Sequence, residues 1–344
     1  LVAYQTAWLK AHYPAEFMAA VISADMHNTD KVVTFIDECR HMGLKVLPPD
    51  VNSCGFRFTV NDDGHIVYGL GAIKGVGHSV VDAIIAERDA NGPYTDLTGF
   101  CRRVEHDKIN RRAIEAMVKA GAMGDFGLSR RALMQQVPEA LASADQAARA
   151  AAAGQNDMFG LEAPAPVVDA PVAVDMPEWP EAEFLRYEKE ALGLYLTGHP
   201  FDALRRDAMA FVDGQLSDIM AEPPPQSSKG ERNYAQAQRE VTVAGLIADI
   251  RKRGNRVSVV LDDDTGRMEI GFFSEAFQDF RHLLDKDEIV VISGGLRYDD
   301  FQSNWTVNAK HVTDIDRVIE SRAQGIVLSL EPNGKGKALL VQLH

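Results

Sequence analysis

The residue types best suited to chemistry lie in one short glycine-rich stretch. Two glycines flank Val76, an isoleucine and a lysine precede them, and a histidine and a serine follow. Glycine lets the backbone approach a phosphate group closely, and the unpaired N–H groups at the start of a following helix favour an anion. We therefore predict a helix-hairpin-helix motif that holds the DNA backbone without reading bases. Its predicted DNA-binding residues are Lys74, Gly75, Val76, Gly77, His78 and Ser79.

Two other interpretations of this stretch remain open. Gly69 and Gly71 precede it and suggest a nucleotide-cofactor loop, but their spacing is not GxGxxG and no GxxxxGK string follows. A glycine-rich turn between two helices, with no ligand, fits the same residues. Neighbouring charged residues therefore matter for the choice.

Basic residues gather in a second stretch. Residues 102–131 contain eight bases and four acids, inside a chain whose formal net charge is -14. Phosphate binding requires clustered bases beside helix N-termini, although an exposed basic helix face has the same composition. We favour DNA binding because the glycine-rich stretch is close by, and we expect an asparagine to cap the helix here. This adds Lys108, Asn110, Arg111 and Arg112 to the predicted DNA-binding residues.

A third candidate site lies at residues 154–160, at the start of an Ala- and Pro-rich connector. A glutamine and a Met-Phe pair stand there between two glycines. The stretch resembles the short peptide by which bacterial DNA-handling proteins dock on the sliding clamp. Met158 and Phe159 would fill an apolar pocket, and Gln155 would form a hydrogen bond at its rim. The alternative is that both apolar residues pack on the preceding helix.

A fourth candidate site is a basic hairpin tip near residue 254. Its bases, with nearby aromatic rings, are typical of single-strand binding by a small barrel. Residues 241–314 nevertheless contain more acids than bases, so we assign most of the rings to the core. The candidate single-strand DNA residues are Arg251, Lys252, Arg253 and Arg256, and the candidate rings are Phe272, Phe273, Tyr298, Phe301 and Trp305.

The acidic clusters do not predict a catalytic centre. Phosphoryl transfer needs carboxylates that converge on a divalent metal. The three clusters, at 262–264, 299–300 and 314–316, stand where strand ends and turns are expected, and we interpret them as solvated turns. The ten histidines show no ligand spacing, and no GxSxG, HExxH or Walker string occurs. We therefore predict no catalytic residue, metal ligand or cofactor in this chain.

The elements that position these sites change character along the chain. Apolar spacing predicts helices within residues 1–43, with a break near Tyr13 and a cap at Asn28 or Thr29. Alternation then predicts a β-hairpin over 56–70, and short helical pieces follow from 73 to about 153. Ala- and Pro-rich sequence over 138–180 and a second breaker run at 223–230 predict connectors.

The last third of the chain has a strand pattern. Period-two alternation predicts five strands, with one helix between the third and the fourth, at 241–250, 256–262, 268–274, 288–296 and 305–312. That order matches an OB-fold barrel, and the helix position argues against an SH3-like barrel. The expected fold class is a multidomain α+β protein, helical first and all-β in its second part.

Composition sets the broad class of the molecule. With 344 residues, 46% of them hydrophobic, the chain is long enough for two or three folded units. The apolar runs are too short for a membrane span, and three scattered cysteines form no disulfide framework or zinc ribbon. We expect a soluble cytoplasmic protein. Because the chain begins with Leu1 inside a helical pattern, we also expect it to be a piece of a longer one.

Five ordered blocks carry a family resemblance. In chain order they are YQTAWLKAHYPAEFM (4–18), LPPDVN (47–52), GLGAIKGVG (69–77), QNDMF (155–159) and LGLYLTGHP (192–200). Together they resemble the bacterial DNA polymerase III alpha subunit of the replicative type, from residue 1 to about 316. The resemblance implies duplex binding by the glycine hairpin and the helix near Arg111, clamp docking by Gln155, Asp157, Met158 and Phe159, and a single-strand template role for the barrel.

The resemblance also implies a domain plan. Residues 1–60 would end the fingers domain, 61–205 would form a clamp-binding domain with a tandem helix-hairpin-helix, 206–234 would be a linker, 235–315 an OB domain, and 316–344 the start of a domain that binds the clamp-loader tau subunit. The catalytic palm and the PHP domain would lie upstream, so the fragment alone should not polymerise. The parent DNA-directed DNA polymerase would use Mg²⁺ and would also meet the epsilon exonuclease.

Two alternatives belong to other functional classes. A clamp-associated DNA-binding adaptor without catalytic activity differs from a polymerase fragment only in what precedes Leu1. A repair enzyme such as a ligase also combines OB and helix-hairpin-helix modules. Bacterial ligases, however, place the OB module first and carry a four-cysteine zinc site, which three cysteines cannot form.

Overall fold

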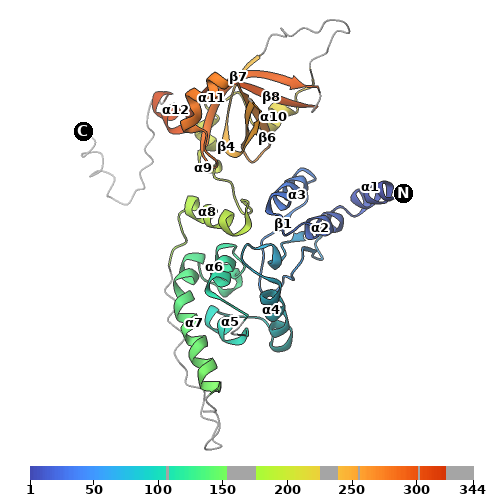
Figure 1. Ribbon diagram of the computed structural model, residues 1–344, viewed down its shortest axis with the longest axis vertical. Coiled ribbons are helices and arrows are strands. Elements are labelled where there is room, and N and C mark those ends of the chain that lie inside the picture. The colour runs from blue at the N-terminus through green and yellow to red at the C-terminus, as the bar shows by residue number, and fades with distance from the viewer. Residues whose placement is uncertain (106–107, 153–175, 225–238, 255, 301–302, 323–344) are drawn as a thin grey trace, which may run out of the picture. The chain divides into compact units, whose positions relative to one another are not determined.

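The chain folds into two compact units, Leu1–His199 and Pro200–His344. The structure is a computed structural model, and it describes residues 1–105, 108–152, 176–224, 239–254, 256–300 and 303–322. The first unit is mainly helical and the second is a β-barrel with short helices (Figure 1). The predicted α+β fold class is therefore confirmed.

The first unit begins with three helices whose ends follow from local sequence. Pro14 occupies the first turn of α2, where its missing N–H costs nothing, and the break before it is the predicted one. The Asn28 side chain accepts a hydrogen bond from the Lys31 N–H, so Asn28 is the cap of α3. The helices are α1 (Val2–His12), α2 (Pro14–Ala24) and α3 (Thr29–His41).

A small three-stranded sheet follows these helices. The predicted hairpin is present as the antiparallel pair of β2 (Thr59–Val60) and β3 (Ile66–Val67). Gly64 has φ of 78°, and the Asn61 side chain accepts from the His65 N–H, so the turn has the expected chemistry. The sequence did not predict β1 (Val46–Leu47), which pairs in parallel with β3.

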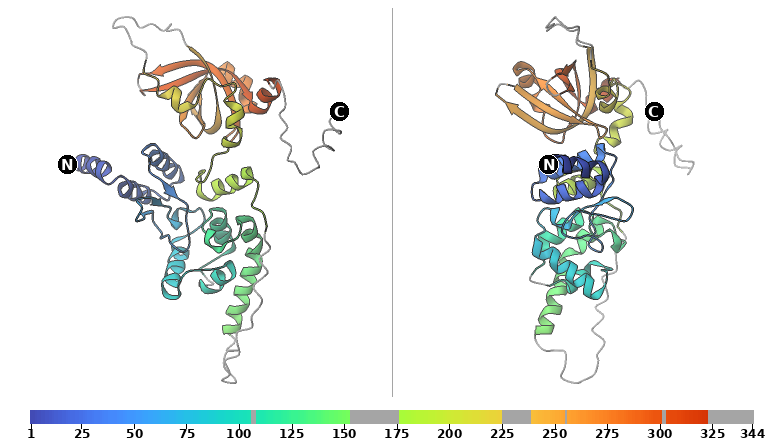
Figure 2. Two further views of the ribbon diagram at one scale, coloured as in Figure 1. Left: turned by 180° about the vertical axis from the view of Figure 1, so that it is seen from behind. Right: turned by 90° about the vertical axis from the view of Figure 1, so that its right-hand side faces the viewer.

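Five further helices complete the first unit. They are α4 (His78–Asn91), α5 (Leu97–Arg103), α6 (Arg111–Lys119), α7 (Arg130–Ala152) and α8 (Glu181–Leu192), with 3-10 turns η1 (Leu70–Ala72) and η2 (Gly124–Phe126). Figures 1 and 2 show α7 passing α5 and α6 and continuing beyond them. Its last core residue is Ala144, so its final two turns lie outside the core.

One hydrophobic core runs through the first unit. It extends from Ala15 to Leu194 without a division near residue 60, where the domain plan placed a boundary between fingers and clamp-binding domains.

All three cysteines are buried and free, and burial raises the pKa of Cys39 to about 11 and that of Cys101 to about 12. At neutral pH these thiols therefore stay protonated and unreactive.

The second unit is a closed five-stranded barrel with the strand order β4-β5-β6-β8-β7. The parallel contact is between β6 and β8, and β4 closes the barrel on β7. Helix α11 (Ser274–Phe280) follows the third strand, as predicted for an OB-fold. The strands are β4 (Arg239–Arg253), β5 (Arg256–Asp262), β6 (Arg267–Phe272), β7 (Ile289–Asp299) and β8 (Asn304–Asp314), and η3 is Arg281–Leu283.

Part of the predicted linker is folded onto this barrel. Helices α9 (Asp202–Ala208) and α10 (Leu216–Met220) lie in or next to the range 206–234 that the domain plan assigned to a linker. Leu216 and Ile219 are 1% and 2% exposed and belong to the barrel core. The linker prediction is therefore corrected for 206–222, while 225–238 lies outside the described residues.

In the Asp262–264 cluster, Asp262 and Asp263 are buried and structural, and only Asp264 is exposed in the turn as the sequence suggested. Asp263 is 3% exposed. Its carboxylate accepts from the Leu216, Thr265 and Gly266 N–H groups and from the Thr265 hydroxyl. Asp263 thus ties the N-terminus of α10 to the turn between β5 and β6. The last helix, α12 (Ile315–Arg322), covers another part of the barrel through Ile315 and Val318.

Within the described ranges no helix combines the length and apolar character needed to span a membrane.

Candidate nucleic-acid interface

The glycine hairpin presents backbone to solvent and anchors itself with two apolar residues. Ile73 and Val76 are 2% and 6% exposed, whereas Lys74, Gly75 and Gly77 are exposed. Gly75 has φ of 85°, a left-handed conformation that a side chain would strain. A Cβ added at either glycine would meet no atom within 4 Å. The alternation of buried and exposed residues therefore leaves a bare backbone surface of the kind a phosphate can approach.

Helix α4 begins directly after this hairpin and offers its N-terminus to the same surface. Gly77 is the N-cap and supplies no side-chain oxygen, and the first turn contains no acidic residue. His78 and Ser79 are exposed. The N–H groups and the positive end of the helix dipole are thus available for an anion from outside the chain. The element before the hairpin is the 3-10 turn η1 and not a full helix, so this half of the motif is shorter than predicted.

The His78 side chain is held in one orientation. Its Nδ1 atom lies 2.6 Å from Asp82 Oδ2, one helical turn further along α4. Its ring also packs on the Phe56 ring, with 4.1 Å between centroids. Phe56 in turn lies so close to Gly71 that a Cβ there would overlap its ring. The residues around the first turn of α4 are therefore positioned by the loop that precedes β2.

The end of α8 supports the hairpin from the inside. The Lys74 N–H donates to the Ala191 carbonyl oxygen at 2.9 Å. Gly193 has φ of 84°, and a Cβ there would lie 3.4 Å from Lys74 Nζ and would overlap Thr29. The 192–200 block, which belonged to the family resemblance, thus has a structural role: its Gly193 packs against the hairpin and Thr29.

A buried ion pair fixes α8 and the chain that follows it. The Glu188 side chain is fully buried, and its carboxylate accepts from the Leu196 and Thr197 N–H groups and from the Thr197 hydroxyl. Arg130 Nη1 lies 3.5 Å from Glu188 Oε1, and its guanidinium stacks on the Phe184 ring. Burial lowers the pKa of Arg130, and the Glu188 carboxylate opposes that shift. No feature of the sequence pattern pointed to this pair.

The second predicted DNA-binding stretch lies at the start of α6. The Asn110 side chain accepts from the Ala113 N–H at 2.9 Å and is the predicted cap. Arg111 and Arg112 are exposed in the first turn, and Arg111 pairs with Glu115 at 2.7 Å. Lys108 is half-buried in the loop before the cap. Helix α6 contacts α8 through Lys119 and Glu190, so both candidate phosphate sites are built against the same helix.

The barrel carries the predicted basic tip at the end of the β4–β5 hairpin. Arg251, Lys252 and Arg256 are exposed, and Arg253 pairs with Arg256 in the strand register. Arg251 also forms an ion pair with Asp249 at 3.0 Å. Of the candidate stacking rings, Phe272 and Trp305 are buried in the core, Phe273 is exposed, and Phe301 lies outside the described residues.

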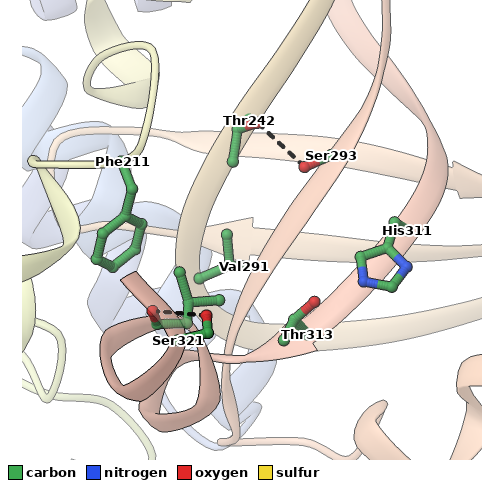
Figure 3. A pocket seen from close by; sticks show the side chains of 8 residues that line it. Phe211, Thr242, Val291, Ser293, His311, Thr313 and Ser321 are labelled. Atoms are coloured by element: carbon green, nitrogen blue, oxygen red, sulfur yellow. Dashed lines mark hydrogen bonds between the residues drawn. The ribbon is translucent and has the colours of Figure 1, made fainter. Parts of the chain in front are cut away.

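A cavity of about 260 Å³ lies elsewhere on the barrel, against β4, β7, β8 and α12. Figure 3 shows Thr242 and Ser293 pointing toward each other, and their hydroxyl oxygens are 3.0 Å apart. His311 and Thr313 line another side. None of the eight described residues that line it is a lysine, arginine or carboxylate, so the cavity lacks the charge expected of a phosphate site.

Two features that the sequence predicted fall on residues outside the described ranges. The clamp peptide, with Gln155, Asp157, Met158 and Phe159, lies outside the described residues, as does the tail from residue 323.

Among the described residues, no group of three or more His, Cys, Asp or Glu side chains could hold a metal ion.

The chain resembles known proteins in both units. The family described as "Helix-hairpin-helix motif" matches residues 43–133, and the "OB-fold nucleic acid binding domain" family matches 241–315. DNA polymerase III subunit alpha of Escherichia coli strain K12 is 45% identical over 350 residues, which cover 100% of this chain and 29% of the relative. The Vibrio cholerae protein of that name is 44% identical, and the match covers 96% of this chain and 28% of the relative. The Pseudomonas aeruginosa protein is 41% identical, and the match covers 96% of this chain and 29% of the relative. The chain therefore spans less than a third of the length of these curated relatives.

Proposed function

The chain is homologous over its whole length to a carboxy-terminal portion of the DNA polymerase III alpha subunit, and from this premise we propose that it holds duplex DNA and tethers a polymerase to the sliding clamp. The observation that carries the proposal is the exposed hairpin of Gly75 and Gly77 at the bare N-terminus of α4. Such a surface binds phosphate without regard to base sequence. The family match over 43–133 supports the same assignment.

The acidic net charge of the chain does not oppose duplex binding. Residues 102–131 carry a surplus of four bases, whereas residues 161–225 contain thirteen acids and four bases. At physiological salt, charges farther apart than about 8 Å are largely screened, so the local surplus governs the approach of a phosphate. We infer that duplex DNA lies along the first turns of α4 and α6.

Charge reversal at the start of α6 tests this path. Arg111→Glu combined with Arg112→Glu is expected to weaken duplex affinity on the order of tenfold, because two phosphate-facing bases are lost. The slope of log K against log salt should also become shallower by about 1 to 2. Fluorescence anisotropy with a labelled duplex at several salt concentrations measures both quantities.

A matched control separates position from overall charge. Arg206 is 97% exposed in α9 of the other unit, and Arg186 is 69% exposed in α8. Arg186→Glu with Arg206→Glu changes the net charge by the same amount and should leave the salt slope unchanged. Equal losses in both double variants would contradict a phosphate site at α6.

We propose clamp docking through Gln155, Asp157, Met158 and Phe159. Gln155 is three residues beyond the end of α7, whose 23 residues span roughly 34 Å. The chain resumes beside the start of that helix, where the Ser129 hydroxyl donates to the Met176 carbonyl and the Glu178 carboxylate accepts from the Arg130 N–H. The peptide thus follows directly from the end of α7 that extends beyond the core.

For the barrel we propose single-stranded template binding at the basic tip of Arg251, Lys252, Arg253 and Arg256. The OB-fold match over 241–315 supports a nucleic-acid role. We further propose that the parent protein is a DNA-directed DNA polymerase of the cytoplasm that meets the tau and epsilon subunits, and that this chain alone does not polymerise. We further propose that the parent protein uses Mg²⁺ for this reaction.

A further inference from the structure

One aromatic ring of the barrel stands apart from the others. Phe273 is 68% exposed, whereas its neighbour Phe272 is 4% exposed and Trp305 is 8% exposed. Inward residues of β6 alternate with outward ones, and Met268, Ile270 and Phe272 fill the core. A single exposed phenylalanine is common on a protein surface, and it is the residues that surround Phe273 that indicate a ligand.

Phe273 lies at the basic tip. It directly follows β6, where Phe272 pairs in register with Val257 and is therefore next to Arg256. Across β5, Val257 also pairs with Lys252 of β4. Phe273 is the N-cap residue of α11, and its carbonyl accepts from the Phe277 N–H. Lys252 Nζ lies 5.7 Å from the centroid of the Phe277 ring, which places this ammonium over the first turn of the helix that Phe273 starts.

We propose that Phe273 is a base-stacking platform for single-stranded DNA, with Lys252 and Arg256 holding the adjacent phosphates. The inference rests on the single-strand role proposed above and names the residue that would contact the bases. Every base has a π-face, so a stacking ring binds single strands with little sequence preference. In duplex DNA the bases are already stacked and paired, and the ring has no face to engage. Phe273 would therefore give a preference for single strands that the basic side chains of Lys252 and Arg256 alone would not give.

The charges around the ring fit this division of roles. Arg251 forms an ion pair with Asp249. Lys252 and Arg256 are exposed beside it. The basic residues of the tip attract any phosphate backbone, whether single-stranded or duplex, so the preference for single strands has to come from stacking. We accordingly expect the affinity to depend strongly on Phe273 and the salt dependence to depend on Lys252 and Arg256.

The test uses the full chain and a labelled oligo-dT strand in fluorescence anisotropy. Phe273→Ala should weaken binding by about 5- to 100-fold with an unchanged salt slope. Lys252→Ala with Arg256→Ala should make the salt slope shallower by about 1 to 2. Phe273→Trp should restore the affinity, and the fluorescence of the added indole should be quenched by oligo-dT but not by duplex DNA. Met209→Ala, which removes another exposed apolar side chain of the same unit, is the matched control and should have no effect.

The outcomes separate the inference from the function on which it rests. If the wild-type chain binds oligo-dT and Phe273→Ala binds it with the same affinity, the stacking role alone is overturned. If neither Phe273→Ala nor the Lys252→Ala, Arg256→Ala variant changes the affinity for oligo-dT, the barrel's proposed single-strand role is overturned as well. A loss in Phe273→Ala that Phe273→Trp does not restore also contradicts stacking, because a larger aromatic ring should stack at least as well.

Discussion

Alanine at both Met158 and Phe159 is expected to weaken binding of the sliding clamp by about 100- to 1000-fold. A few buried anchors carry most of the free energy when a short peptide docks, and truncating them removes about 3 to 4 kcal/mol. The two residues are the large apolar side chains of the 154–160 stretch. Duplex affinity should remain at its wild-type value, because the peptide is separate in sequence from α4 and α6.

Surface plasmon resonance with immobilised beta clamp measures the first quantity, and anisotropy with a labelled duplex measures the second. Leu161→Ala, two positions beyond the Met-Phe pair, is the matched control and should bind the clamp normally. A double variant that retains full clamp affinity rules out this peptide as the docking site. A parallel loss of duplex affinity would show instead that the substitutions damage the fold.

The barrel was predictable because its sequence pattern is local. Alternation marks each strand, and one helical interval after the third strand selects the OB order. Most of the candidate rings were assigned to the core, and the exposed Phe273 is the exception that the pattern did not single out. The folded helices at 202–220 were missed because their neighbourhood is acidic and rich in proline, and a few buried residues such as Leu216 and Ile219 are enough to hold them.

The support of the hairpin could not be predicted from spacing. Glu188 and Arg130 are 58 positions apart, and each alone looks like an ordinary surface charge of a helix. Their burial depends on how α7, α8 and the following loop meet, which is a tertiary arrangement. The buried Asp263 illustrates the same limit, since its role as a cap depends on α10, 47 positions away. Gly75 of the hairpin, by contrast, was recognisable because its requirement is a local, left-handed backbone conformation.

The central claim is that DNA phosphate occupies the bare N-terminus of α4, and Gly77→Asp tests it because stability and binding should respond in opposite directions. Gly77 has φ of -86° and ψ of 165°, and an added Cβ meets no atom within 4 Å. Aspartate is a favourable N-cap in that conformation, so the helix should be as stable as before or slightly more stable. Its carboxylate would, however, occupy the N–H groups that the phosphate needs and would repel the phosphate.

The decisive measurement is duplex affinity of Gly77→Asp by anisotropy, with thermal unfolding of the same sample. Gly77→Ala, which adds a methyl group to open space without charge, is the matched control and should bind within about threefold of wild type. We predict a loss of about 100-fold for Gly77→Asp with an unchanged or slightly raised Tm. Wild-type affinity and an unchanged salt slope in Gly77→Asp would contradict the assignment of the phosphate site.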